Sequence, residues 1–138
     1  MPLTLTLTEG VIAPEKVGDA IAQLSDAMLA AHDLTGNSVM TPNVTANVHF
    51  VPAGQSYSGG EIFKGAWIEW KVPSFAFATT EIQKTYGRQV TEIITDLSGG
   101  TQPADNIYFN VVHTVDGAWN LDGDAMTNDE IVQAISRG

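Results

Sequence analysis

The sequence predicts an α+β domain built from a tandem β-α-β repeat, in the order β-α-β-β-α-β, with a four-stranded mixed sheet and two helices on one face. Two short segments alternate apolar and polar residues, two further short segments have the composition of strands, and two longer ones carry an apolar stripe at helical spacing. The order strand, helix, strand occurs twice, and Leu5 in the first unit matches Ile68, 63 positions later. Within each unit we expect parallel strands joined by a right-handed crossover.

In the first unit, leucines alternate with threonines over Leu3–Leu7, which is typical of a strand with one buried face. A helix is predicted over Pro14–His32, because proline suits a first helical turn and Gly36 supplies a stop. A second strand follows at Val44–Phe50, and then a loop rich in glycine. The helical stripe consists of Val17, Ile21, Leu24, Met28 and Ala31.

The second unit repeats this order with strands at Ala66–Val72 and Ile107–His113. Between them, Thr80 and Gln83 have the spacing of a capping box that opens a helix. The apolar stripe of this helix is Ile82, Tyr86, Val90, Ile93, Ile94 and Leu97.

We interpret residues 1–138 as a single domain with pseudo-repeats at 1–60 and 61–115 and a C-terminal extension at 116–138. Thr127 and Glu130 form another capping box, so the extension is expected to hold a short helix. Two helices on one sheet face leave the other face bare. That face carries either the leucine row or the threonine row of the first strand, and an apolar one would be covered by oligomerisation.

Composition excludes several classes of protein. The chain has 6 Lys and Arg against 16 Asp and Glu, a net charge of −10, so we expect no nucleic-acid partner and no membrane partner. It has no cysteine, which excludes a disulfide scaffold and a catalytic thiol. The N-terminal segment lacks the basic and apolar regions of a signal peptide, so a cytoplasmic location is expected.

Pro2 is the strongest catalytic candidate. In one interpretation it only begins an edge strand, where a missing N–H costs little. In the other, Met1 is removed, as is usual before a small residue, and Pro2 becomes a free secondary amine. Burial at the tip of a strand would lower the pKa of that amine. A base is most useful when its pKa lies near the working pH, so the amine could move a proton between carbon and oxygen.

The N-terminal Met1-Pro2, the alternating strand and the tandem β-α-β order resemble the tautomerase superfamily, which includes 4-oxalocrotonate tautomerase and macrophage migration inhibitory factor. The segments 34–36, 48–54, 58–60 and 107–109 look most like its cis-3-chloroacrylic acid dehalogenase-like branch. Gly117-Ala118-Trp119-Asn120 is similar to a segment near the end of macrophage migration inhibitory factor. The resemblance implies a homotrimer, with pockets at the N-terminal proline near subunit boundaries.

The resemblance also implies candidate substrate-binding residues. A histidine on the first helix of the dehalogenase-like branch corresponds, one turn later, to His32, whose other interpretation is a solvated histidine favoured by the helix dipole. Where that branch has two arginines, this chain has Lys71, Phe75 and Phe77. Lys71 offers a point charge or simply alternates outward, and the phenylalanines either line an apolar pocket mouth or pack in the core.

Two further candidates lie in the last predicted strand. Asn110 stands where the branch has a tyrosine, and it can donate a hydrogen bond to a substrate carbonyl. Tyr108 faces the same side by alternation, although packing is the commoner role of a strand tyrosine. Leu121 stands where the branch has its water-activating glutamate, so hydration and dehalogenation are disfavoured.

The sequence thus predicts a cofactor-free tautomerase for an α-keto or enol substrate with an apolar portion, with Pro2 as the base. The alternatives are a non-catalytic binding or assembly protein of the same fold and a Pro2-dependent hydratase or dehalogenase. No metal site is expected, because His32, His49 and His113 lie on separate elements. The stretch from Ala118 to Asp129 departs from a calcium-binding loop at its first and last ligands.

Overall fold

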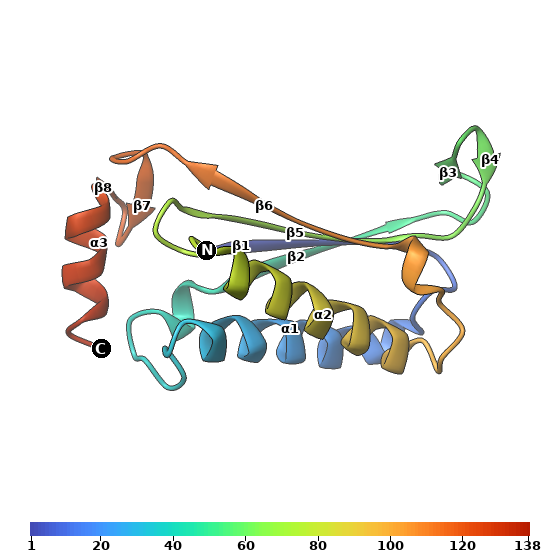
Figure 1. Ribbon diagram of the computed structural model, residues 1–138, viewed down its shortest axis with the longest axis horizontal. Coiled ribbons are helices and arrows are strands. Elements are labelled where there is room, and N and C mark those ends of the chain that lie inside the picture. Colours follow the sequence, from blue (N-terminus) through green and yellow to red (C-terminus); the bar gives the residue numbers. More distant parts are fainter.

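The computed structural model describes residues 1–138, and its centre is a four-stranded mixed sheet. The strands are β1 (Pro2–Thr8), β2 (Thr45–Val51), β5 (Ala66–Pro73) and β6 (Ile107–Thr114), in the order β2-β1-β5-β6. The pairs β1–β2 and β5–β6 are parallel, whereas β1 and β5 are antiparallel. The predicted β-α-β-β-α-β order and the mixed sheet are confirmed (Figure 1).

Helices α1 (Val17–Ala31) and α2 (Thr80–Leu97) lie side by side across one face of this sheet (Figure 1). The 3-10 turn η1 (Pro14–Lys16) runs directly into α1, so proline opens the helical segment as predicted. The predicted cap of α2 is wrong by one residue. Thr79 is the N-cap and accepts from the Ile82 N–H, which leaves the Gln83 side chain free to bond elsewhere. None of the helices combines the length and the apolar character that crossing a bilayer requires.

The leucine row, not the threonine row, faces the helices. Leu3, Leu5 and Leu7 are fully buried, whereas Thr4 and Thr6 are half-buried on the opposite face. Of the two alternatives, the threonine row therefore lies on the open face, which also carries asparagine and charged side chains. Its main apolar feature is a cluster of Phe63, Trp67 and Tyr108 near one end.

A pair of hydrogen-bonded aromatic side chains ties the helices to the sheet. The Trp70 Nε1–H of β5 donates to the Tyr86 hydroxyl of α2 at 2.9 Å, and that hydroxyl donates to the Leu24 carbonyl of α1 at 2.9 Å. Both side chains are fully buried, and burial raises the pKa of the Tyr86 phenol well above its usual range. The hydrogen bonds of the Trp70 indole and the Tyr86 hydroxyl offset the cost of removing these two polar groups from water.

Two short hairpins and a helix complete the chain. The hairpin of β3 (Tyr57–Ser58) and β4 (Glu61–Ile62) stands at one end of the sheet, and β7 (Trp119–Leu121), β8 (Asp124–Met126) and α3 (Asn128–Ile135) stand at the other (Figure 1). The capping box of Thr127 and Glu130 is confirmed. The remaining 3-10 turns are η2 (Thr41–Asn43) and η3 (Ala104–Asn106).

Candidate functional site

Pro2 begins a central strand of the sheet. β1 lies between β2 and β5, and Pro2 pairs with Thr45 of β2. The interpretation of Pro2 as the start of an edge strand is therefore wrong. Because a proline cannot donate to a ladder, it is tolerated in a central strand only at a position such as the first residue.

The backbone alternation of β1 directs the Pro2 nitrogen toward β5. The N–H groups of Met1 and Glu9 donate to β2-side carbonyls, whereas the Thr8 N–H donates to the Gly65 carbonyl at 3.0 Å on the β5 side. Even-numbered residues of β1 thus point their nitrogens at β5. Leu3 pairs with Trp70, so continuing this register places Pro2 opposite Lys71.

The N-terminal amine of the chain is desolvated. Met1 is only 4% exposed, and its amine donates to the Asn43 carbonyl, which extends the β1–β2 ladder by one residue. Burial lowers the pKa of this amine from 8.0 to about 6. Burial therefore favours the neutral form of the Met1 amine at neutral pH.

We predict that the Met1 amine of the Met1-retaining chain titrates with a midpoint near pH 6 instead of near 8. Since the unfolded amine binds its proton more tightly, the stability of this chain should rise as pH increases from about 6 to 8 and level off on either side. NMR of a chain labelled with ¹⁵N-methionine would follow the titration directly. A midpoint near 8 would contradict burial of the amine.

Lys71 and Asn110 converge on the same carboxylate. The Glu69 carboxylate lies 3.4 Å from the Lys71 ammonium and accepts from the Asn110 amide at 3.1 Å. By strand alternation these side chains share the open face with Pro2 and Thr4. The Lys71 side chain is 54% exposed, so the ion pair contributes little to stability and can be exchanged for a bound anion. Two sequence-predicted residues are thus brought together at Glu69, Lys71 on β5 next to β1 and Asn110 one strand farther away on β6.

Tyr108 lies on the open face but farther along the sheet. It stacks on Trp67 with ring centroids 6.0 Å apart, and Phe63 meets both rings edge-on. Trp67 pairs with Thr6, whereas Pro2 is at the opposite end of β1. Within one chain, Tyr108 is therefore remote from Pro2, although it remains 40% exposed.

Both ring nitrogens of His32 form hydrogen bonds with backbone groups. Nδ1 donates to the Met28 carbonyl at 2.9 Å, and Nε2 accepts from the Phe77 N–H at 2.9 Å. Its ring also meets the Phe77 ring edge-on, with centroids 4.7 Å apart. His32 is thus neither a solvated helix-end histidine nor free to contact a ligand. It holds the turn that follows β5.

The two phenylalanines of that turn differ. Phe77 is fully buried among Trp70, Tyr86 and Phe109, which is the core-packing alternative. Its φ of 51° is unusual for a bulky residue, and the Gln83 amide stabilises it by donating to the Phe77 carbonyl at 2.7 Å. Phe75 is only half-buried and packs against the edge of the core.

Sequence reasoning missed the asparagines that organise this end of the sheet. Asn37 accepts from the Val39 and Met40 N–H groups and donates to the Ile135 carbonyl of α3 at 3.0 Å. Asn128 donates to the Ser74 hydroxyl at 2.8 Å. The C-terminal extension is therefore tied to the loops on both sides of Pro2. An asparagine after Gly36 is a turn signal, but its long-range partner has no local signature.

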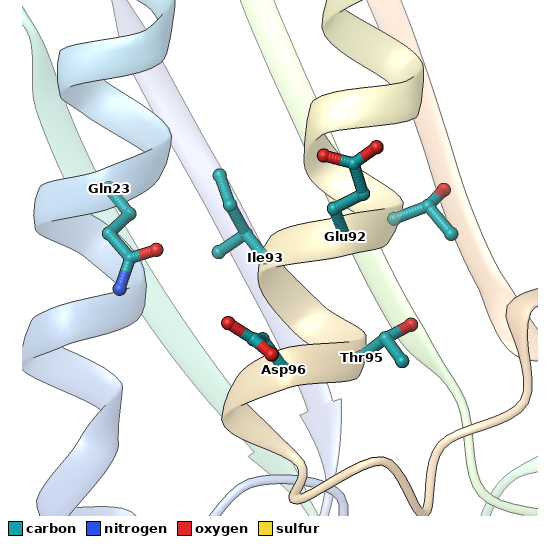
Figure 2. A pocket seen from close by; sticks show the side chains of 6 residues that line it. Gln23, Glu92, Ile93, Thr95 and Asp96 are labelled. Atoms are coloured by element: carbon teal, nitrogen blue, oxygen red, sulfur yellow. The ribbon is translucent and has the colours of Figure 1, made fainter.

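One surface depression lies on the helix layer, away from Pro2. Figure 2 shows Gln23 of α1 across from Ile93 and Asp96 of α2, with Glu92 and Thr95 beside them. Five of its six lining residues are polar, two of them carry carboxylates, and none is basic. It contains none of the sequence-predicted site residues.

The sequence matches no protein-family model and no curated protein. Solved structures do match. A fused 4-OT, solved as an asymmetric trimer, matches with a TM-score of 0.74 at 17% identity. The match covers 95% of this chain and 98% of the 4-OT chain. The macrophage migration inhibitory factor-like protein from Entamoeba histolytica has a TM-score of 0.68 at 17% identity, with 91% and 97% covered.

A member of the cis-3-chloroacrylic acid dehalogenase family matches at a TM-score of 0.71 and 14% identity, with 96% of this chain and 90% of that chain covered. This chain has the tautomerase fold. The resemblance inferred from the sequence is confirmed at the level of the fold. Pt0534, solved after inactivation by 2-oxo-3-pentynoate, is also similar, with a TM-score of 0.73, 16% identity and coverages of 95% and 98%.

Proposed function

We propose that this chain, after removal of Met1, is a cofactor-free tautomerase that interconverts the keto and enol forms of a small carbonyl compound. The observation that carries the proposal is the position of Pro2 as the first residue of the central strand β1, with its nitrogen directed toward β5 opposite Lys71. A neutral secondary amine on Pro2 would take a proton from the carbon next to the carbonyl. The electron pair of that C–H bond forms the enol double bond, and a proton is returned to the oxygen.

Two polar groups on the open face, Lys71 and Asn110, would stabilise the negative charge that develops on the enolate oxygen. Lys71 supplies a positive charge that an anionic substrate can share with Glu69. The Asn110 amide can turn from Glu69 to a substrate oxygen. These roles are specific to substrates that carry an oxyanion or a carboxylate.

We further propose a homotrimer with the pocket at a subunit boundary. The open face presents Tyr108 and Val112 at 40% exposure each, and the edge strands β2 and β6 have no partner on their outer sides within the chain. The similar fused 4-OT was solved as a trimer. Strand edges and exposed apolar groups of this kind are commonly covered by another copy of the chain.

The decisive test is covalent labelling with 2-oxo-3-pentynoate, the compound that inactivates Pt0534. An amine adds to the electron-poor triple bond of this reagent, so a nitrogen–carbon bond forms and the carbon chain takes up the amine proton. We expect one equivalent of label on Pro2 of the Met1-free chain by intact mass and peptide mapping. The Met1-retaining chain is the control: its Pro2 nitrogen is an amide, so any label on this chain must map to the Met1 amine or to a lysine and not to Pro2. Label spread over Lys71 and other lysines, or none at all, would overturn the proposal.

A non-catalytic protein of the same fold is the second candidate, and one observation favours it. Met1 fits the fold well, with a buried side chain and a hydrogen-bonded amine. If the native protein retains Met1 by intact mass, Pro2 carries no basic nitrogen and this candidate replaces the first. A hydratase or dehalogenase is disfavoured, since Leu121 offers no carboxylate to activate water.

A further inference from the structure

The Phe77 turn, residues 74–79, joins β5 to α2 (Figure 1). Two histidines from elements that are distant in the sequence hold its backbone. The Phe77 N–H donates to Nε2 of His32, at the end of α1, at 2.9 Å, and Nε2 of His113 on β6 donates to the Ala76 carbonyl at 2.7 Å. The two imidazoles therefore contact adjacent residues of one turn in opposite hydrogen-bonding roles.

The partners of His32 determine where its ring carries a proton. The Phe77 N–H can only donate, so Nε2 has no proton, and Nδ1 donates its proton to the Met28 carbonyl at 2.9 Å. This arrangement requires the neutral ring. A protonated imidazole has an N–H at both nitrogens, and one of them would face the Phe77 N–H. Protonation of His32 would thus break the hydrogen bond that holds Phe77.

The contact made by His113 responds differently to acid. The Ala76 carbonyl can only accept, so Nε2 of His113 carries the proton in the neutral ring and keeps it in the charged ring. Protonation at Nδ1 therefore leaves the contact intact. The other residues of the shallow depression that contains His113 are uncharged: Gln83, Phe109, Asn110 and Val111.

No charged group pairs with the His32 ring. The groups that contact it are the Met28 carbonyl of α1 and the N–H and ring of Phe77. On the α2 side, the Gln83 amide is neutral and donates to the Phe77 carbonyl at 2.7 Å. The only ion pair in the structure lies elsewhere, on β5. The charged residues on the adjoining segments are all exposed, and they are Asp33, Glu81 and Lys84.

Phe77 depends on these contacts because of its backbone conformation. Its φ is 51°, in the left-handed region that bulky residues rarely adopt, and its ring is fully buried. A residue in such a conformation keeps it only while the surrounding structure holds it in place. Loss of one holding contact therefore loosens the turn, whereas the sheet is kept together by its own ladder.

We propose that His32 is a pH-sensitive switch, which fastens the Phe77 turn when its imidazole is neutral and releases the turn when the imidazole is protonated. Histidine changes its charge between about pH 5 and 8, so acid lowers the stability of the chain through this contact over that range. The switch is independent of the proposed reaction, since neither His32 nor Phe77 takes part in it.

The proton positions are tested first. Long-range ¹H–¹⁵N NMR of the full chain at pH 8 reports which ring nitrogen of each histidine carries the proton. We expect the proton of His32 on Nδ1 and the proton of His113 on Nε2. A proton on Nε2 of His32 at pH 8 would overturn the switch, because the Phe77 N–H would have no acceptor on that ring.

Matched variants measure the effect on stability. His32→Gln and His113→Gln each replace one imidazole by an amide, which does not titrate and can still accept or donate. From pH 8 to pH 5 the Tm of the parent should fall by about 3 °C or more beyond the fall for His32→Gln, whereas His113→Gln should follow the parent. The Met1 amine is the same in all three chains, so its contribution cancels. Equal falls in all three chains, or a smaller fall in both variants, would contradict the switch.

Amide hydrogen exchange of the parent provides a test that needs no variant. The protection factor of the Phe77 N–H should fall at least about tenfold from pH 8 to pH 5, because a released turn exposes this group to water. The Thr8 N–H is the control, since it donates to the Gly65 carbonyl at 3.0 Å at the far end of β1 and should keep its protection. Unchanged protection of Phe77, or an equal loss at Thr8, would rule out a local switch at His32.

Discussion

Pro2→Ala in the Met1-free chain should slow keto–enol exchange by at least about 10²-fold, the lower end of what a positioned general base contributes. Alanine is also a small residue that permits removal of Met1, so the two chains carry the same N-terminal processing. The variant keeps a primary amine but loses the pyrrolidine ring that fixes the direction of the nitrogen toward β5. Initial rates of deuterium incorporation, followed by NMR with 2-oxohexanoate, give the ratio of kcat values.

The matched control is Thr4→Ala, which changes the next residue on the same face of β1. The Thr4 side chain has no role in the proposed reaction. The exchange rate of Thr4→Ala should therefore stay within about twofold of the parent rate, as for surface changes outside a functional site. Equal activity of Pro2→Ala and the parent would contradict the role of Pro2 as the general base. In that case the retained activity belongs to another group, and Lys71 would be the next residue to test.

Trp70→Ala should lower the free energy of unfolding by about 3–5 kcal/mol, the range for truncating a large buried aromatic side chain. The Trp70 side chain is fully buried on the face of β5 that packs against the helices, and its indole N–H donates a hydrogen bond to the Tyr86 hydroxyl. The substitution leaves both a cavity and a buried hydroxyl with one partner fewer. Urea unfolding followed by circular dichroism measures the loss.

Trp67→Ala is the corresponding control. Trp67 is three positions earlier on β5, is half-buried on the open face and stacks on Tyr108. Loss of an aromatic pair at such a position should lower the free energy of unfolding by about 1 kcal/mol. A larger loss for Trp67 than for Trp70 would contradict the face assignment of β5. Dependence of the Trp67 loss on protein concentration would indicate that the open face is buried between copies of the chain.

The central sheet was predictable because its signals are local. The alternation of leucine and threonine in β1 and the helical stripes of α1 and α2 depend on residues two to four positions apart, and burial of one face enforces the same periodicity. The short hairpins were missed, because strands of two or three residues are too short to show a period. The cap of α2 was misplaced by one residue because Thr79 and Thr80 are both competent to cap, and only the backbone conformation selects Thr79.

Sequence reasoning could propose site residues only where the type of residue and its place in a strand suggest a role. Pro2 was found by its position and chemistry, and strand alternation was sufficient to give Tyr108 and Asn110 a common face. His32 and Phe77 contact each other within the chain. Their role is decided by a contact between a helix end and a turn 45 residues away, which leaves no trace in local spacing.

The sequence by itself determined the order of elements, the acidic and cysteine-free character of the chain, and the presence of a proline after the first methionine. Tertiary structure alone decided which face of β1 meets the helices, that β1 is central, and that its N-terminal end is desolvated. The physical reason is that period and composition are properties of neighbouring residues. Burial, strand order and the pKa of an amine depend on which distant segments exclude water from it.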